Sequence, residues 1–181
     1  MVKMAVISNT TTIIDAGAIS VAKGSLTLIK TLTASSSGTL TFHHGASGVI
    51  LDSTYKEYMF EFINIHPSAN DSYFTFQANA VGESGFNETI TSTMFRAYNK
   101  EDSSANALVY EAGDYDLSQA TGFQVLNDSV GTDTDQSTCG RLNIFNPSST
   151  TFLKHFIYTG VENAQDNKVQ NTFTARYFNT T

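Results

Sequence analysis

The sequence predicts an all-β fold, an antiparallel two-sheet sandwich of jelly-roll type with an extended N-terminal arm. The 181 residues include 13 Phe and 8 Tyr but no Trp and only two Pro, and 15% of them are charged. Aromatic and hydroxyl-bearing residues favour half-buried strands over long helices. Residues 55–67 and 72–77 alternate at period two, as strands with one buried face do. About nine or ten such segments, separated by turn residues, are typical of a sandwich.

Residues 1–24 differ from the rest and predict a docking arm or a first pair of strands. Their apolar residues come in short groups between Thr-rich and Gly-containing turns, with a single acidic residue, Asp15. A strand-forming terminus of low charge would aggregate if it stayed free in solution. We therefore expect this arm to contact a neighbouring subunit, and the sandwich domain to span residues 25–181. The expected assembly contacts are Val6, Ile7, Ile13 and Ile14.

The first part of the sandwich is predicted from alternating apolar and hydroxyl residues. Strands are expected over residues 26–33, 39–42 and 49–51. Residues 55–67 and 72–77 are expected to pair as an antiparallel hairpin, whose aromatic face lies in the interior between the sheets. The residues expected on this face are Tyr58, Phe60, Phe62, Phe74 and Phe76.

The second part is predicted to continue in further short strands. Residues 114–122 are expected to hold one helical turn, and residues 127–138 an acidic loop. Either the last strand is expected at an edge of the sheet, or the sheet is expected to be completed by another chain. The expected strands are 89–98, 108–110, 123–126, 141–145, 152–158 and 172–178.

Charge and composition argue against several classes of partner. The net charge is −7 and the ten basic residues are scattered singly, whereas nucleic-acid binding depends on clustered Lys and Arg. No apolar run approaches the length of a membrane span. The N-terminus lacks the apolar core and cleavage site of a secretion signal, so we expect synthesis and folding in the cytoplasm. The single cysteine, Cys139, can form neither an internal disulfide nor a zinc site.

Three aspartates form the densest group of carboxylates. Asp128, Asp133 and Asp135 lie in one segment with Asn127, and calcium binds to carboxylate and carbonyl oxygens. However, no Glu closes the loop as in helix-flanked calcium sites. The favoured interpretation is a solvated acidic loop, with calcium as the alternative.

A second group suggests carbohydrate binding. Tyr110, Tyr115 and Asp116 combine rings that stack on sugars with a hydrogen-bonding carboxylate. Asp114 and Asp116 also form a pair of the kind used in glycoside hydrolysis. No nucleophile elbow, phosphate-binding loop or zinc-protease motif accompanies them. The sequence therefore predicts a non-enzymatic protein with no cofactor, and a glycan site only as an alternative.

Several segments carry a resemblance to a known group of proteins. They are residues 6–9 (VISN), 13–17 (IIDAG), 48–55 (GVILDSTY), 60–67 (FEFINIHP), 146–151 (NPSSTT) and 154–156 (KHF). With these the chain resembles virion-associated proteins of tailed phages of marine bacteria, including phages of cyanobacteria. The similarity covers most of the chain and is most specific at residues 60–67. In that group the equivalent of residues 177–181 continues into one or two more strands, so this chain resembles a short or cut member.

The resemblance implies a component of the virion, at the tail or its fibres, and transfers no catalytic motif. The leading hypothesis is a homo-oligomeric tail or tail-fibre protein that acts in particle assembly and host attachment. Its partners would be further copies of itself, in a trimer or another symmetry, and other virion proteins. A capsid decoration protein and a module that binds host-surface glycans are the alternatives.

Overall fold

The computed structural model describes residues 5–8, 11–15, 18–19 and 26–179, and the chain divides into two compact units, residues 1–50 and 51–181. The first unit contains an antiparallel sheet of three short strands: β1 (Ala5–Ser8), β2 (Thr11–Asp15) and β3 (Ala18–Ile19). In this sheet Val6 pairs with Ile14. The N-terminal segment thus contains short strands, whereas its boundary at residue 24 and its role in assembly remain predictions.

The strands expected over residues 26–33, 39–42 and 49–51 are not formed, since residues 26–51 contain turns, bends and irregular backbone. Leu26 and Leu28, the apolar side of the first expected strand, are 71% and 83% exposed. An alternating segment becomes a strand only where a partner takes up its backbone hydrogen bonds. The backbone hydrogen bonds within residues 43–49 are local, such as the one that the Ala46 N–H donates to the His43 carbonyl at 3.1 Å.

The second unit confirms the all-β prediction with eight antiparallel strands, and the described residues contain no helix. The helical turn expected over residues 114–122 is therefore wrong. The strands are β4 (Glu57–Ile65), β5 (Ser72–Phe76), β6 (Ile90–Lys100), β7 (Asn106–Glu111), β8 (Gln124–Val130), β9 (Thr138–Phe145), β10 (Lys154–Ala164) and β11 (Lys168–Phe178).

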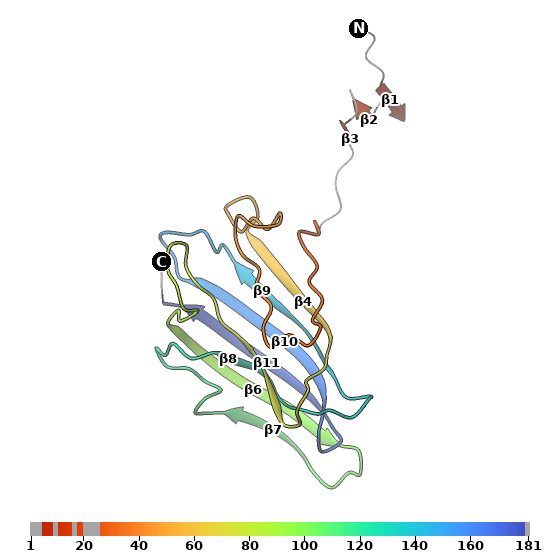
Figure 1. The fold of residues 1–181 in the computed structure, drawn as a ribbon, viewed down its shortest axis with the longest axis vertical. Helices are drawn as coiled ribbons and strands as arrows, with labels where there is room; N and C mark the ends of the chain where they lie inside the picture. The colour runs from red at the N-terminus through yellow and green to blue at the C-terminus, as the bar shows by residue number, and fades with distance from the viewer. Residues whose placement is uncertain (1–4, 9–10, 16–17, 20–25, 180–181) are drawn as a thin grey trace. The chain divides into compact units, whose positions relative to one another are not determined.

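Six of these strands lie side by side in the order β4-β9-β10-β11-β6-β7, which we call the main sheet (Figure 1). β5 pairs with β8, and β8 joins the main sheet through the pairing of Val130 with Ala164 of β10. β11 is bonded on both sides, to β10 and β6. The expectation that the last strand would lie at an edge is therefore wrong, and β4 and β7 form the edges of the main sheet. Completion of the sheet by another chain remains a prediction.

The expected hairpin of residues 55–67 with 72–77 is also wrong, because β4 pairs with β9 and β5 pairs with β8. The β4–β9 ladder becomes irregular between Phe62 and Ile65, where Asn64 has a positive φ of 52°. After this point the chain leaves the main sheet and builds the β5–β8 pair. Alternation identified the strands and their buried face, but it carries no information on the partner strand.

Only one face of the main sheet is covered by other described strands of this unit. The face on which the β5–β8 pair packs is called the inner face, and the opposite one is called the outer face. Phe62 of β4 meets Phe74 of β5 at 4.8 Å between ring centroids, and Phe76 meets Phe156 of β10 at 5.6 Å. The predicted packing of the aromatic face is confirmed in part: Tyr58 is buried, and the other four rings are half-buried and pack on a core of Ile90, Leu117, Leu126, Leu142, Ile144, Phe156, Tyr158 and Phe178.

A pair of glycines makes room for the Tyr158 ring between the main sheet and β8. Gly140 of β9 and Gly160 of β10 are opposite each other in register, and the Tyr158 ring lies along the inner face above them. A Cβ atom added at either glycine would lie 2.3 or 2.1 Å from the Tyr158 oxygen. The Tyr158 hydroxyl donates a hydrogen bond to Asn127 Oδ1 of β8, and burial raises its pKa above the ordinary value. Glycine at both positions therefore permits one of the bonds that tie β8 to the main sheet.

Candidate functional site

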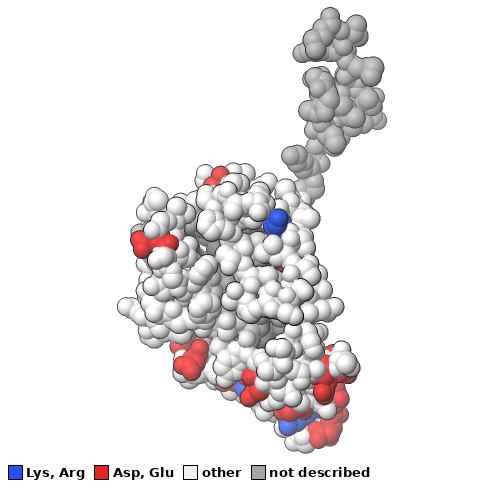
Figure 2. All heavy atoms as spheres, in the orientation of Figure 1, with Lys and Arg blue, Asp and Glu red and all other residues white. Residues whose placement is uncertain are grey.

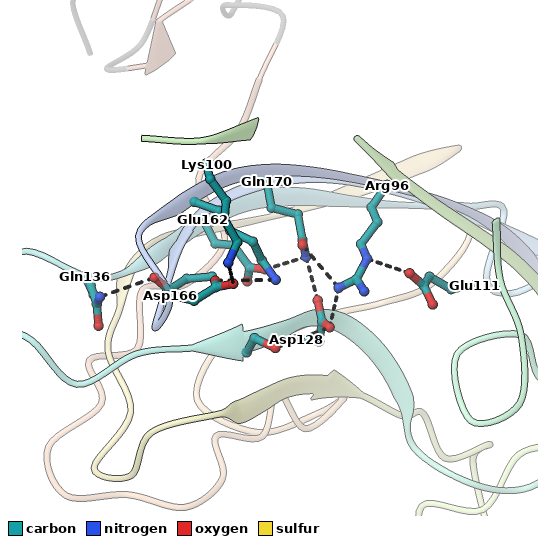
Figure 3. Close-up of polar contacts among 11 residues, drawn as sticks. Arg96, Lys100, Glu111, Asp128, Gln136, Glu162, Asp166 and Gln170 are labelled. Atoms are coloured by element: carbon teal, nitrogen blue, oxygen red, sulfur yellow. Dashed lines mark hydrogen bonds and ion pairs between the residues drawn. The ribbon is translucent and has the colours of Figure 1, made fainter. Parts of the chain in front are cut away.

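A chain of charged and amide side chains fills one end of the inner face, and we call it the buried polar network. Its members come from five strands: Arg96 of β6, Glu111 of β7, Asp128 of β8, Glu162 of β10 and Gln170 of β11. In Figure 3, Arg96, Glu162 and Gln170 point from the main sheet toward β8, and Asp128 points back from β8. The network therefore spans the space between the two layers.

Each member of the network is held by at least one other. Arg96 forms ion pairs with Glu111, at 2.5 Å, and with Asp128, and it donates to Gln170 Oε1 at 3.1 Å. Gln170 Nε2 donates to Asp128 Oδ1 at 2.5 Å and to Glu162 Oε1 at 2.6 Å. Asp128, Glu162 and Gln170 are buried, so these bonds form where water contributes little. Bonds of this kind fix one register between layers because a misplaced partner would leave a buried charge unpaired.

Protonation differs between the two ends of the network. Burial opposes the charge of Arg96, but Asp128 and Glu111 outweigh it and raise the pKa of Arg96 above its ordinary value. At the other end, burial and then the nearby charge of Asp128 raise the pKa of Glu162 to about 8. Glu162 is therefore mainly a neutral acid at pH 7, while Arg96 carries the positive charge between two carboxylates.

Arg176 of β11 is a second buried cation on the inner face. Its guanidinium lies 5.3 Å from the Phe156 ring centroid, and Nη2 donates to the Val125 carbonyl of β8 at 3.1 Å. Among the described residues, Nε and Nη1 have no hydrogen-bond partner, and none of the ion pairs there involves Arg176. Burial accordingly lowers its pKa well below the ordinary value. The side chain adds one more tie between β11 and β8 at a cost in desolvation.

The candidate glycan residues are brought together in part. The Tyr110 hydroxyl, on exposed β7, donates to Asp116 Oδ2 at 2.8 Å, and this bond raises the pKa of Tyr110. Tyr115 instead lies beside Tyr73 of β5, with the two ring centroids 5.9 Å apart and the two hydroxyl oxygens 3.3 Å apart. Burial raises the pKa of Tyr115 above its ordinary value. The three residues thus form two separate contacts, and glycan binding remains a prediction.

The three candidate calcium ligands are not grouped. Asp128 lies within β8 and is bonded to Arg96 and Gln170, whereas Asp133 and Asp135 are exposed in the loop that follows. The expected acidic loop over residues 127–138 is therefore wrong at both ends, since β8 extends to Val130 and β9 begins at Thr138. Among residues 26–179 and the described part of the arm, no three His, Cys, Asp or Glu are close enough to hold a metal ion.

Sequence reasoning missed most of the network. Arg96, Glu111, Glu162 and Gln170 were not singled out, because charged and amide residues are usually exposed. The available signal was the even spacing from core residues along each strand: Arg96 is two residues from buried Met94, and Glu162 is four residues from buried Tyr158. A side chain at period two from a core residue points to the same face of the strand. Of the candidate arm contacts, Val6 and Ile7 lie on β1, and Ile13 and Ile14 on β2, but their side chains are outside the described residues.

The outer face has the opposite chemistry. Every second residue of 91–99, 106–110, 155–163 and 169–177 points outward from strands β6, β7, β10 and β11, and none of them is Lys, Arg, Asp or Glu. Phe95, Leu108, Tyr110, Ile157, Val161 and Val169 are exposed there. Charged outward residues, Glu57, Glu61 and Arg141, occur only on β4 and β9. Charged side chains are likewise sparse on the side of the molecule that Figure 2 shows.

The comparisons with known proteins add no assignment. No protein-family model, no curated protein and no solved structure matches the chain. The described residues also include no helix with the length and apolar character needed to cross a membrane.

Proposed function

We propose that this protein is a non-enzymatic structural component of a phage virion, which acts as a homo-oligomer in the tail or tail fibre during particle assembly and host attachment. The observation that carries the structural role is the contrast within one sheet: charges are buried on the inner face, and the outer side of β6, β7, β10 and β11 has no charged residue and carries exposed rings. Such a face suits permanent contact with protein better than contact with water. The virion as the place of action rests on the resemblance of residues 48–55 and 60–67.

The finer architecture belongs to the same proposal. A two-sheet sandwich of jelly-roll type, with the main sheet as one layer and the β5–β8 pair as the other, is supported by the ring contacts of Phe74 and Phe76 with the main sheet. It is also supported by the bonds from Tyr158 and Arg176 to β8. A sandwich locked by such bonds would keep its shape under the mechanical load of a tail.

The test is to look for the protein in purified particles. Mass spectrometry of gradient-purified virions from infected cells should detect its peptides, at a copy number matched to the tail proteins and resistant to high-salt washing. A copy number matched to the major capsid protein would instead support the decoration protein. Complete absence from particles, with abundant protein in the lysate of the same cells, would overturn the virion assignment in both forms.

A further inference from the structure

We propose that the outer face of β10, β11, β6 and β7 is a self-association surface, on which the same face of a second copy packs around a twofold axis. This inference deepens the proposed function, since it rests on the homo-oligomer and names the surface that forms it. It commits to one occupant, another copy of this chain.

The first argument is the missing charge. An antiparallel sheet with one face in water normally places polar and charged residues at every outward position. Here the outward positions of four neighbouring strands carry no Lys, Arg, Asp or Glu, although the chain as a whole contains 27 such residues, 10 basic and 17 acidic. Leu108 is 75% exposed and Tyr110 is 57% exposed on this face. The exclusion of charge from one face, and not from the rest of the molecule, indicates a surface that is covered in the assembled state.

The second argument is the shape of the face, which has a ridge and two hollows. Phe173 of β11, Phe95 of β6 and Tyr110 of β7 are neighbours in register, and the centroids of the two Phe rings are 5.0 Å apart. They form a ridge across the face. One hollow lies over Gly140 and Gly160, toward β4 and β9, and Glu61 and Arg141 also line it. A second hollow, on the other side of the row, is bordered by Ile157 and Ala175 and suits an apolar ridge better. A second copy turned by a twofold axis can place its ridge in a hollow of the first, which is the self-complementarity that such a contact needs.

The third argument is size. Strands β6, β10 and β11 have 11 residues each and β7 has 6, which at about 3.3 Å per residue and about 4.8 Å per strand gives roughly 600 Å² of projected area. Side-chain relief raises the accessible area above this value. Two such faces together bury roughly 1,200 Å², the lower end of the range for specific, stable interfaces, so the face can hold a dimer.

The fourth argument selects a second copy over another partner. A partner of positive charge would be matched by carboxylates, and this face has none. An identical uncharged face requires no charge complement, and the net charge of −7 then stays outside the contact. Glu57, Glu61 and Arg141 on β4 and β9 would border the contact, as the polar rim of an interface does.

The experiment measures the self-association of the full chain by analytical ultracentrifugation over a range of concentrations. Two substitutions place a carboxylate on the face, Phe95→Glu in the ridge and Leu108→Glu at an exposed position beside it. The matched control is Val81→Glu, which adds the same charge at a residue that is 88% exposed in the segment between β5 and β6. Phe95→Glu, in the ridge, is expected to raise the dimer dissociation constant at least about thirtyfold, and Leu108→Glu, on the edge strand β7, at least about tenfold. The control is expected to leave this constant unchanged.

Circular dichroism and thermal unfolding of the same samples separate loss of association from loss of folding. Leu108 is the safer position because its side chain is largely exposed, so Leu108→Glu decides the question if Phe95→Glu unfolds the protein. A monomeric wild-type chain at all concentrations, an unchanged constant for Leu108→Glu, or equal weakening by Val81→Glu would each overturn the proposal. If the protein is a dimer in solution but absent from virions, the proposed function is wrong and the self-association surface stands. If the protein is a monomer in solution but present in virions, the self-association surface is wrong and another virion protein covers this face.

Discussion

Arg96 and Phe95 are neighbours in β6, yet they show how differently the two faces of the main sheet are built. Arg96 points to the inner face, where it is held between Glu111 and Asp128. Phe95 points to the outer face, where it is 41% exposed beside Phe173. Charges are thus buried and rings are exposed, the reverse of the usual arrangement. The difference teaches that the inner face determines how this subunit folds, whereas the outer face is available to determine what the subunit binds.

The largest expected effect compares two phenylalanines on opposite faces. Phe156→Ala removes a fully buried ring of the inner core and is expected to lower the free energy of unfolding by about 4 kcal/mol. Phe95→Ala removes a half-exposed ring and is expected to cost about 1 kcal/mol or less. Urea unfolding in the Leu108→Glu background measures both without a contribution from self-association. Equal losses for the two variants would contradict the assignment of Phe95 to an uncovered face of the folded subunit.

The next effect compares two Arg–carboxylate contacts. Arg96→Ala leaves Glu111 and buried Asp128 without their cation and is expected to cost about 3 kcal/mol, because an unpaired buried charge is poorly solvated. Arg141→Ala on the outer face breaks the pair with Glu61 at 2.8 Å. Both of those side chains are exposed, so the expected cost is at most about 1 kcal/mol. Thermal unfolding at pH 7 and low salt compares the two. If Arg96→Ala costs no more stability than Arg141→Ala, the buried polar network does not hold β8 on the main sheet.

The strands of the inner face show how much of the fold could be predicted from the sequence. The alternation of Tyr58, Phe60 and Phe62 identified a strand and its buried face, because side chains alternate across a strand whatever its neighbours are. The partner could not be found this way: β4 pairs with β9, and Tyr58 lies opposite Ile144, far along the chain. Backbone hydrogen bonds are the same for every residue, so only the complete set of packed side chains selects the pairing.

The site was harder to predict than the fold, for a related reason. Asp128 was assigned to a loop because it lies among Asn, Ser and Gly, which are common in turns. In the structure it is a buried strand residue whose position depends on Arg96 and Gln170, two side chains more than 30 residues away in the sequence. Partners this distant leave no local pattern. The outer face was visible in principle, since the absence of charge at every second residue of 91–99 and 169–177 can be read directly, but only the pairing of β11 with β6 joins these positions into one surface.

The smallest of the expected effects concerns the pH dependence that the inner face imposes. The pKa of Glu162 in the folded state is about 8, raised first by burial and then by Asp128, against an ordinary value of 4.5. Between these two values the folded state binds more protons than the unfolded state. The free energy of unfolding should therefore fall as the pH rises through this window, and level off above pH 8. Glu162→Gln keeps an oxygen that accepts the bond from Gln170 and cannot ionise, so it should remove this slope.

At pH 9 we expect Glu162→Gln to be more stable than the wild type by about 2 kcal/mol, less than the full shift implies because a charged side chain relaxes toward water. At pH 5 the two proteins should be nearly equal. Urea unfolding across this range measures the effect, and Glu61→Gln on the outer face, which removes an exposed carboxylate paired with Arg141, is the control. The groups that face Glu162 are Asp128, Arg96, Lys168 and Gln170, and Arg96 and Lys168 stabilise its charged form. If the free energy of unfolding of Glu162→Gln still falls with rising pH, the pH dependence belongs to another group and not to Glu162.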